Sequence, residues 1–351
     1  MSKSELSGKV QTVLGVINPD ELGITLMHEH LLLDITCYFY ESEYASVRSF
    51  KDIPFKPELT SKSYELYVHH LDGGRMYDES ETIQEVTAYK NSGGNSLVDT
   101  TSIGIGRDPL GLARISRATS LNIIMGSSYY VTNSHPENMD QKTESQITNE
   151  IIGDITIGVK DTNIRSGIIG EVGNFWPLTK NEIKVLLASG KAQKETGAPI
   201  TIHSGLGDDA PMGILNHLIR GGAKPTNCIL GHLDTAIQST LHFIELAKTG
   251  CYLEFDIFGW ENTGMFMDDV INMPNDGGRL EKIIFLIENG FEDQIVIAQD
   301  VCRKWHLSRN GGKGYDHILN NIVPRMEKIG ISESQINKLL VKNPAKALAF
   351  E

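Results

Sequence analysis

The sequence predicts an α/β protein with the fold of a (β/α)8 barrel, and two patterns along the chain support this class. Eight short apolar or β-branched runs recur, each of which ends in polar or glycine residues. Near-continuous apolar strands of this kind are typical of a parallel sheet that helices cover. The stretches that follow the runs have helical periodicity, so strand and helix alternate eight times, which favours a barrel. A doubly wound open sheet is the chief alternative.

The chain is expected to open with a β-hairpin over residues 9–25, with its turn centred on Asn18-Pro19-Asp20, because these residue types favour turns. A long insertion over residues 35–78 follows the first barrel strand. A connection of this length is usually functional or carries short helices of its own. The eight barrel strands are expected at residues 24–34, 95–103, 122–131, 165–173, 198–205, 227–234, 251–259 and 294–302.

Three of the helical stretches are especially clear, and each ends at a glycine that suits a C-cap. They are residues 181–197, 240–250 and 277–290. The 351 residues contain no convincing domain boundary and no repeat beyond the β/α unit, so residues 1–351 are expected to form a single barrel domain. One barrel of about 250 residues with insertions accounts for this length.

The net charge and the cysteine content indicate which binding partners and which cellular compartment to expect. The chain has 32 Lys and Arg against 45 Asp and Glu, a formal net charge of −13, which argues against nucleic acid or an anionic membrane as a partner. No apolar stretch of about 18 residues could span a membrane, and no signal peptide follows the first lysines. The four cysteines form no CxxC pair, which is typical of a cytoplasmic protein. We therefore expect a small-molecule substrate, with a homodimer left open.

Metal-capable side chains gather where the predicted strands end. In His28-Glu29-His30 both imidazoles share one face, because alternate residues of a strand point the same way. Glu171 lies within an apolar strand, where a buried carboxylate is costly unless it is paired or bound to a metal. The carboxyl ends of barrel strands are also where active sites are built. The complete set is His28, His30, Glu171, His203, His232 and Asp300.

Four imidazoles and two carboxylates exceed what one tetrahedral zinc ion needs, so this set predicts two divalent metal ions. A single histidine is more often a packed or exposed side chain than a metal ligand. Six such residues at the functional ends of strands favour a shared site instead. With imidazole and carboxylate ligands and no thiolate, Zn²⁺ is the expected ion, while Mn²⁺, Co²⁺ and Fe²⁺ stay open.

Five ordered motifs resemble the phosphotriesterase family of the amidohydrolase superfamily, namely TLMHEHLLLD, GIIGEVG, TIHSG, GHLD and IAQD. Four further stretches are similar to the branch called phosphotriesterase-related protein, namely GKVQTVLGVI, GCYLEFDIFG, GGKGYDHIL and NPAKALAF. The resemblance runs nearly end to end and implies a distorted (β/α)8 barrel of the metal-dependent amidohydrolase type. It implies His28, His30 and Asp300 on one ion, His203 and His232 on the other, and Glu171 as the bridge between them.

The bridge departs from the founding members of the family, in which it is a carboxylated lysine. Glu171 supplies a carboxylate directly, so the binuclear core is retained, but efficient triester hydrolysis is put in doubt. The resemblance implies a zinc-dependent hydrolase in which a bridging hydroxide attacks a small ester, lactone or amide. We expect an anionic head group on the substrate, of the sugar-lactone phosphate or N-acyl amino sulfonate type.

Three other functions are weighed against this one. A promiscuous organophosphate triesterase is the alternative within the same chemistry, and a non-catalytic metal-binding sensor is the alternative from another class. The sensor fits less well because all six expected ligands are present. A mononuclear deaminase of the same superfamily also fits less well, because such enzymes generally lack the carboxylate at the position of Glu171.

Three residues are given roles around the predicted metal ions. Asp300 is expected to accept the proton of the nucleophile and pass it to the leaving group. Tyr130 matches a tyrosine at the same strand end in lactonase relatives, and it could orient the substrate, donate to the developing oxyanion or simply pack at the barrel rim. Asp234 is expected either to orient His232 or to cap the next helix.

A basic cluster follows the last predicted strand in this otherwise acidic chain, and it begins at Arg303 and Lys304. The loops after strands 7 and 8 are a common anion site in barrels. Arg303 is therefore expected to pair with a phosphate, sulfonate or carboxylate of the substrate, with Lys304 in reserve. Simple solvation of these loop charges is the competing interpretation.

Overall fold

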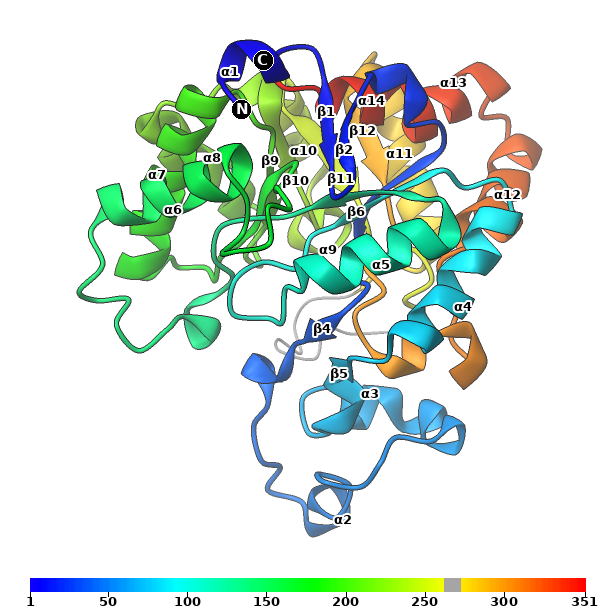
Figure 1. The fold of residues 1–351 in the computed structure, drawn as a ribbon. Coiled ribbons are helices and arrows are strands. Elements are labelled where there is room, and N and C mark those ends of the chain that lie inside the picture. The colour runs from blue at the N-terminus through cyan, green and yellow to red at the C-terminus, as the bar shows by residue number, and fades with distance from the viewer. Residues whose placement is uncertain (262–272) are drawn as a thin grey trace.

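Eight parallel strands with helices around them confirm the barrel that the sequence predicts (Figure 1). The computed structural model describes residues 1–261 and 273–351. Every predicted barrel strand is present, although each is shorter than its expected range. The strands are β3 Thr25–Glu29, β6 Ser96–Asp99, β7 Asn122–Met125, β8 Ile169–Gly173, β9 Ile200–His203, β10 Cys228–Leu230, β11 Tyr252–Phe255 and β12 Ile295–Ile297.

The barrel strands are hydrogen-bonded in two arcs, β3–β6–β7 and β8–β9–β10–β11–β12. At one seam the amide of Asp300, which follows β12, donates to the carbonyl of His28 in β3 at 3.2 Å. At the other seam the amide of Gly170 in β8 donates to the carbonyl of Ser127, which follows β7, at 2.6 Å. The barrel is therefore distorted, as expected, and both seams lie beside residues of the predicted metal set.

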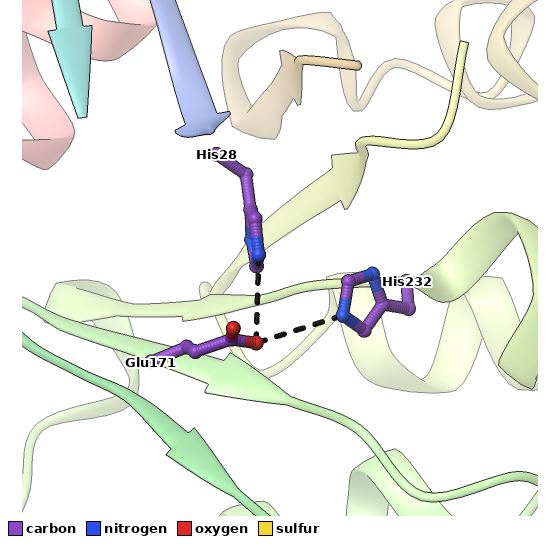
Figure 2. Close-up of side chains that lie close together, drawn as sticks. All are labelled: His28, Glu171 and His232. Carbon is purple, nitrogen blue, oxygen red and sulfur yellow. Dashed lines mark ion pairs between the residues drawn. The ribbon is translucent and has the colours of Figure 1, made fainter. Parts of the chain in front are cut away.

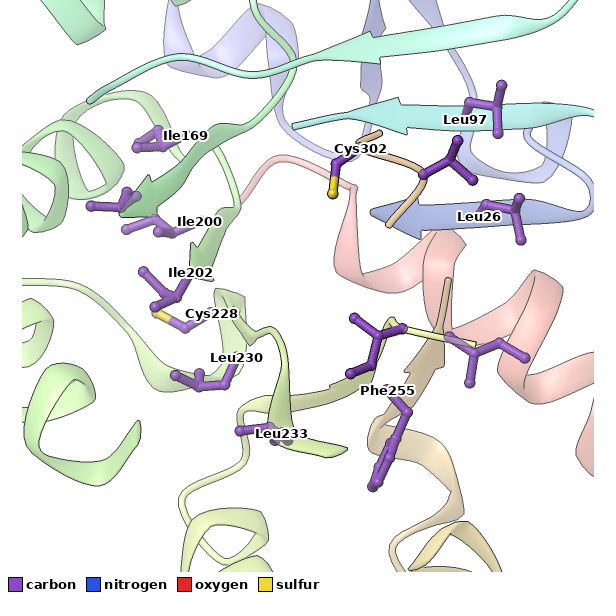
Figure 3. Close-up of a cluster of buried hydrophobic side chains, with 14 of the residues drawn as sticks. Leu26, Leu97, Ile169, Ile200, Ile202, Cys228, Leu230, Leu233, Phe255 and Cys302 are labelled. Atoms are coloured by element: carbon purple, nitrogen blue, oxygen red, sulfur yellow. The ribbon is translucent and has the colours of Figure 1, made fainter. Parts of the chain in front are cut away.

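Apolar side chains pack on both faces of the strands. Leu26 and Leu97 belong to a large cluster that also includes residues of the surrounding helices, and Figure 3 shows part of it. The next residues along the same strands, Met27 and Val98, belong to a smaller separate cluster. Because successive residues of a strand point to opposite faces, the smaller cluster fills the barrel interior below the strand ends that carry the predicted site.

The helices begin and end where local sequence supplies caps. Before α7 (Lys180–Thr196) the side chain of Thr179 accepts from the amide of Glu182, whose carboxylate accepts in return from the amide of Thr179. The same helix ends at Gly197, whose φ of 76° is the left-handed conformation of a C-cap. The other helices of at least eight residues are α4 Glu79–Asn91, α5 Pro109–Thr119, α6 Glu144–Thr156, α8 Ala210–Gly221, α10 Thr240–Ala247 and α11 Asp276–Glu288.

Short helices occupy the chain termini and the connection after β10. They are α1 Lys3–Leu6, α9 Leu233–Ala236 directly after β10, and α12 Val323–Lys328, α13 Glu333–Asn337 and α14 Asn343–Ala347 near the C-terminus. Within the described ranges no helix is long and apolar enough to cross a membrane.

The N-terminal hairpin forms as predicted, but its predicted turn is wrong. β1 (Val10–Thr12) pairs antiparallel with β2 (Gly15–Ile17), so the turn lies at residues 13–14. The hydroxyl of Thr12 closes this turn, because it accepts from the amide of Leu14 at 3.2 Å and donates to the carbonyl of Gly15 at 2.8 Å. Asn18 instead precedes a short 3₁₀ helix, where its amide donates to the carboxylate of Glu21 at 2.7 Å.

The insertion after the first barrel strand carries short helices, as expected, and extends away from the barrel (Figure 1). Its two ends are tied together by β4 (Leu33–Asp34) and β5 (Arg75–Met76), which pair antiparallel. Between them lie α2 (Ala45–Arg48), α3 (Ser63–Leu66) and several 3₁₀ turns, the first of which spans Thr36–Tyr38. That first turn brings one insertion residue to the mouth of the barrel.

Candidate metal centre

The six residues of the predicted metal set meet at one end of the barrel. His28 lies in β3, Glu171 in β8 and His203 at the end of β9. His30 follows β3 directly, while His232 and Asp300 lie in the loops that follow β10 and β12. Five of them are buried, and the side chain of His203 is 16% exposed. Because parallel strands bring their carboxyl ends to one rim, residues that are far apart in sequence become neighbours here.

Irregular strand pairing aims two of these side chains at each other. The pairing of β3 with β6 shifts within residues 26–29, and the pairing of β8 with β9 shifts within residues 169–172. An extra residue of this kind breaks the strict alternation of side chains and re-aims them. His28 and Glu171 lie inside the two shifted stretches, and their side chains point toward one another (Figure 2).

The carboxylate of Glu171 stands at the centre of the imidazoles. Its Oε2 lies 3.4 Å from Nε2 of His28, 3.2 Å from Nδ1 of His203 and 3.7 Å from Nε2 of His232. Its Oε1 lies 3.4 Å from Nε2 of His30. The two oxygens therefore face different imidazoles, which is the arrangement that a carboxylate bridging two cations requires.

Asp300 and His232 are both held in unusual backbone conformations. Oδ1 of Asp300 lies 3.3 Å from Nε2 of His30. The φ angles are 47° for Asp300 and 56° for His232, in the left-handed region. Residues other than glycine rarely adopt this region, and those that do are concentrated at functional sites.

A second pair of carboxylates, which the sequence did not allow us to assign, lies behind the imidazoles: Glu254 in β11 (Tyr252–Phe255) and Asp256 directly after it. Oδ1 of Asp256 is 2.8 Å from Nδ1 of His232, and its Oδ2 accepts from the His232 amide at 2.8 Å. Nδ1 of His28 lies 3.3 Å from Asp256 and 3.4 Å from Glu254. In the sequence, two carboxylates at alternate positions of the apolar run at residues 251–259 were the signal that could have identified them.

The remaining two imidazoles also have a partner on the nitrogen that faces away from Glu171. Nδ1 of His30 lies 2.9 Å from the hydroxyl of Thr101, and Nε2 of His203 lies 3.3 Å from the hydroxyl of Tyr38. Partners of this kind fix the tautomer and the ring orientation of metal-binding histidines.

Electrostatic interactions within the cluster shift the protonation of its members. Burial would raise the pKa of Glu171, but the neighbouring imidazoles outweigh it and hold that pKa well below its usual range. Burial would lower the pKa of His28, yet Glu171 and Asp256 outweigh it and raise that pKa. For Asp300, the hydrogen bond from His30 outweighs burial and lowers the pKa. The two carboxylates are therefore ionised at neutral pH and attract positive charge.

The donor atoms fit metal ions. Nε2 of His28 is buried and has no hydrogen-bond partner among the described residues, although it is directed at Glu171. An orphaned imidazole nitrogen beside carboxylates is an available ligand atom. Three groups in residues 1–261 and 273–351 bring ligand atoms close enough to hold an ion, and two combine members of the predicted set: His28, Glu171 and His232, and His28, His30 and Asp300. The third is His28, Glu254 and Asp256.

A cavity of 330 Å³ opens above this cluster, and Glu171, His203, His232 and Asp300 are part of its wall. Most of the remaining wall is aromatic or aliphatic, from residues such as Tyr67. No lysine or arginine is found among the described residues that line it. The cavity therefore offers a small, largely apolar chamber with one polar wall, as small-molecule sites usually do.

Tyr130 lies on the cavity wall, next to the cluster. Its hydroxyl is 3.2 Å from Nδ1 of His203 and accepts a hydrogen bond from the hydroxyl of Tyr38 at 3.1 Å. Burial raises the pKa of both tyrosines, so both hydroxyls keep their protons at neutral pH. The structure thus brings Tyr130 to the predicted site, where it can donate or accept.

Arg303 lies beside the cavity but not on its wall. Its side chain is 2% exposed, and its guanidinium stacks over the ring of Tyr67 at 4.5 Å. No described carboxylate pairs with it, and its Nε has no hydrogen-bond partner in the described part of the chain. Lys304 is directed elsewhere, to the carboxylate of Asp72 in the insertion at 2.7 Å. Arg303 is therefore a buried cation next to the cavity wall with no carboxylate partner in residues 1–261 and 273–351, whereas Lys304 pairs with Asp72.

Asp234 has neither of the roles that the sequence suggests. Its carboxylate accepts from Nε of Arg279 in α11 at 3.0 Å and from the amide of Ile257 at 3.3 Å. It lies within α9 rather than capping it, and Asp256 is the residue that contacts His232. Asp234 therefore ties the β10 and β11 loops to α11 behind the site.

Comparison with protein families and curated proteins finds relatives along the whole chain. A model of the phosphotriesterase family matches residues 8–348. An N-acetyltaurine hydrolase from Dictyostelium discoideum is 39% identical to this chain, and the match covers 99% of both proteins. An N-acetyltaurine hydrolase from Homo sapiens is 38% identical, and the match covers 99% of this chain and 100% of the human protein. A phosphotriesterase-related protein from Nematostella vectensis is 39% identical, covering 98% of this chain and 99% of its own.

Solved structures show the same fold. A resiniferatoxin-binding protein from Rhodobacter sphaeroides superimposes with a TM-score of 0.93 at 31% identity, covering 99% of this chain and 98% of its own. A lactonase from Listeria monocytogenes superimposes with a TM-score of 0.78 at 23% identity, covering 98% and 99% of the two chains.

Proposed function

Because the chain belongs to the phosphotriesterase family, we propose that it is a binuclear metal-dependent hydrolase that cleaves an N-acyl amino sulfonate of the N-acetyltaurine kind. One observation carries the proposal. Four imidazoles surround the carboxylate of Glu171 at the wall of a small cavity, and the carboxylate of Asp300 contacts one of them. Several relatives that match from end to end are named for hydrolysis of this amide.

The proposed ligands are divided between two ions. His28, His30 and Asp300 would hold one, and His203 and His232 the other. Glu171 would contact both, since its carboxylate lies near imidazoles of both sets. Imidazole and carboxylate donors favour Zn²⁺, with Mn²⁺, Co²⁺ and Fe²⁺ as substitutes. When bound, the ions would lower the pKa of a water molecule between them and polarise the scissile carbonyl.

Side chains of the protein would transfer protons, donate hydrogen bonds and exclude water from the cavity. Asp300 is ionised and lies on the cavity wall, so its carboxylate can accept the proton of the attacking water and deliver it to the leaving nitrogen. The Tyr130 hydroxyl lies on the same wall and can donate to the oxygen of the scissile carbonyl as charge develops there. The apolar remainder of the cavity excludes water and strengthens both interactions.

We assign recognition of the anionic end of the substrate to Arg303. Its buried guanidinium has no carboxylate partner among the described residues, which is costly, and an anionic ligand would offset that cost. The guanidinium stacks over the ring of Tyr67, which is part of the cavity wall, so the positive charge lies next to that wall. This agrees with a sulfonate, which carries a full charge, better than with a neutral triester. Lys304 has no part in it, because Asp72 already neutralises that ammonium group.

A second candidate function is the binding of an apolar ligand without hydrolysis. It is favoured by the relative named as a resiniferatoxin-binding protein and by the apolar wall of the cavity. In that case the metal ions would have a structural role, and no bond of the ligand would be cleaved.

The test is turnover by metal-loaded protein. Protein that holds two zinc ions per chain is assayed with N-acetyltaurine, its ester isostere 2-acetoxyethanesulfonate, an aryl ester, a lactone and a phosphate triester, with Glu171→Gln as the inactive control. We expect the amide to give the highest kcat/KM. A triester or lactone preference would overturn the substrate assignment, and no turnover with two bound metals would favour the binding function.

A further inference from the structure

The insertion after the first barrel strand contributes a residue to the candidate metal centre. Tyr38 ends the first 3₁₀ turn of that insertion, and its side chain lies on the cavity wall. Its hydroxyl lies 3.3 Å from Nε2 of His203 and donates to the hydroxyl of Tyr130 at 3.1 Å. Its ring packs edge-on against Tyr130 and Phe175, with centroids 5.9 and 6.1 Å away. Tyr38 is thus held between a proposed metal ligand and a proposed catalytic hydroxyl.

The two nitrogens of His203 have different surroundings. Nδ1 faces the metal cluster, 3.2 Å from Oε2 of Glu171 and 2.8 Å from Nε2 of His232. Nε2 points the other way, to Tyr38. A neutral imidazole carries one donor and one acceptor nitrogen. If Nδ1 offers its lone pair to the cluster, Nε2 must carry the proton, and that proton is donated to the oxygen of Tyr38.

The direction of each hydrogen bond follows from the first. Because the Tyr38 oxygen accepts from His203, its own proton is free to be donated, and the geometry directs it to the oxygen of Tyr130. The Tyr130 oxygen therefore accepts from Tyr38. The Tyr130 proton cannot be donated to Nδ1 of His203 when that lone pair is engaged, so it is left to be donated into the cavity.

We propose that Tyr38 is a positioning residue that sets the direction of a hydrogen-bond relay, from His203 through Tyr38 to Tyr130, and so presents the Tyr130 hydroxyl as a donor to the scissile carbonyl. The inference rests on the proposed function and adds the insertion to the catalytic apparatus. Tyr38 does not touch the substrate oxygen in this scheme. It acts through Tyr130.

A double-mutant cycle with Tyr38→Phe, Tyr130→Phe and the double variant tests the relay. Removing one donor to a developing oxyanion typically lowers kcat by about 100-fold, which we expect for Tyr130→Phe. Tyr38→Phe leaves that donor in place but undirected, so we expect roughly a 10-fold lower kcat with KM changed by less than about twofold. The double variant should equal Tyr130→Phe, because Tyr38 has no other route to the reaction. Effects that multiply would overturn the relay, as would an unchanged kcat for Tyr38→Phe.

Two readouts separate this relay from a structural role and from failure of the proposed function. Zinc content is measured for all variants, and we expect two ions per chain in each; loss of metal from Tyr38→Phe would mean that Tyr38 only supports His203. Binding of a tetrahedral phosphonate analogue of the amide, measured by calorimetry, should show the same non-additive pattern without any turnover. Wild-type turnover therefore tests the proposed function, and the cycle tests the relay. The matched control is Tyr40→Phe, in the same insertion but 54% exposed, which should change none of these values.

Discussion

Replacing Asp256 by asparagine tests whether the carboxylates behind the imidazoles set the affinity for metal. Asp256 accepts from both Nδ1 and the backbone amide of His232 at 2.8 Å, one donor to each of its oxygens. Asparagine retains one acceptor and turns an NH2 group toward the other donor, so one charge-assisted hydrogen bond is lost. Such a bond contributes about 1.5–3 kcal/mol, which corresponds to roughly 10- to 100-fold in metal affinity.

The contact of Glu254 provides an internal comparison for that prediction. Its Oε2 lies 3.4 Å from Nδ1 of His28, beyond the usual length of a strong hydrogen bond, and its Oε1 has no partner among the described residues. Glu254→Gln is therefore expected to weaken metal binding by less than about threefold. Both variants replace a carboxyl group by an amide at a fully buried position, and the contacts of the two carboxyl groups differ in length.

The assay is competition for zinc with a chelator of known affinity, followed by metal analysis of the protein. Melting temperatures of the metal-free proteins serve as the control for folding. A similar loss of zinc affinity in the two variants would mean that charge alone, and not the hydrogen bond to His232, matters. An unchanged affinity in Asp256→Asn would refute the reasoning altogether.

Three further predictions follow from the site and its surroundings. Glu171→Gln keeps the shape but removes the charge between the imidazoles, so we expect loss of at least one zinc ion per chain by elemental analysis and loss of most activity; two tightly held ions with normal activity would contradict the assignment. Arg303→Ala should lower kcat/KM on a sulfonate substrate by about 30-fold, equivalent to roughly 2 kcal/mol, and leave kcat/KM on a neutral ester unchanged. Lys304→Ala should leave kcat/KM unchanged on both substrates. If Arg303→Ala lowers kcat/KM equally on both, Arg303 supports the loop and not the substrate. Burial would raise the pKa of Asp276, but the hydrogen bond from His317 helps to hold that pKa below its ordinary value in the folded state. Ionised Asp276 therefore stabilises the folded protein fully above about pH 4, and this stabilisation is lost as the pH falls through the lowered pKa of the folded state. Asp276→Asn should therefore destabilise the protein at pH 7 and progressively less at lower pH in denaturant titrations, and a constant difference would argue against the linkage.

The strand order and the set of metal-capable residues could be read from the sequence because both depend on local pattern. A buried parallel strand requires a short apolar run, and a (β/α)8 chain places the residue after each run at one rim. His203 and Asp300 were identifiable for that reason alone. The hairpin turn was misplaced because Asn18 and Pro19 favour a turn and the start of a helix equally, and only the pairing of β1 with β2 distinguishes the two.

The direction of individual side chains was decided by tertiary structure. Side chains along β3 and β8 do not alternate strictly between the two faces, because the pairing of each strand with its neighbour shifts by one residue. No local sequence pattern predicts which residue is the extra one. Asp256 could therefore be found on a strand but not assigned a face. Asp234, two residues after His232, was the nearer carboxylate in sequence, yet Arg279 from a distant helix holds it away from the imidazole.

The sequence by itself determined the barrel, the six residues at its rim and the family, because these follow from periodicity and from which residue types stand at strand ends. Only the tertiary structure decided which nitrogen of His203 faces Glu171 and that Tyr38 of the insertion reaches that ring. It also decided that Arg303 is buried with no carboxylate partner among the described residues, while Lys304 pairs with Asp72. Each of these depends on contacts between segments far apart in the chain. Such contacts are selected by the packing of the whole molecule, since a side chain adopts the direction that its distant neighbours leave open.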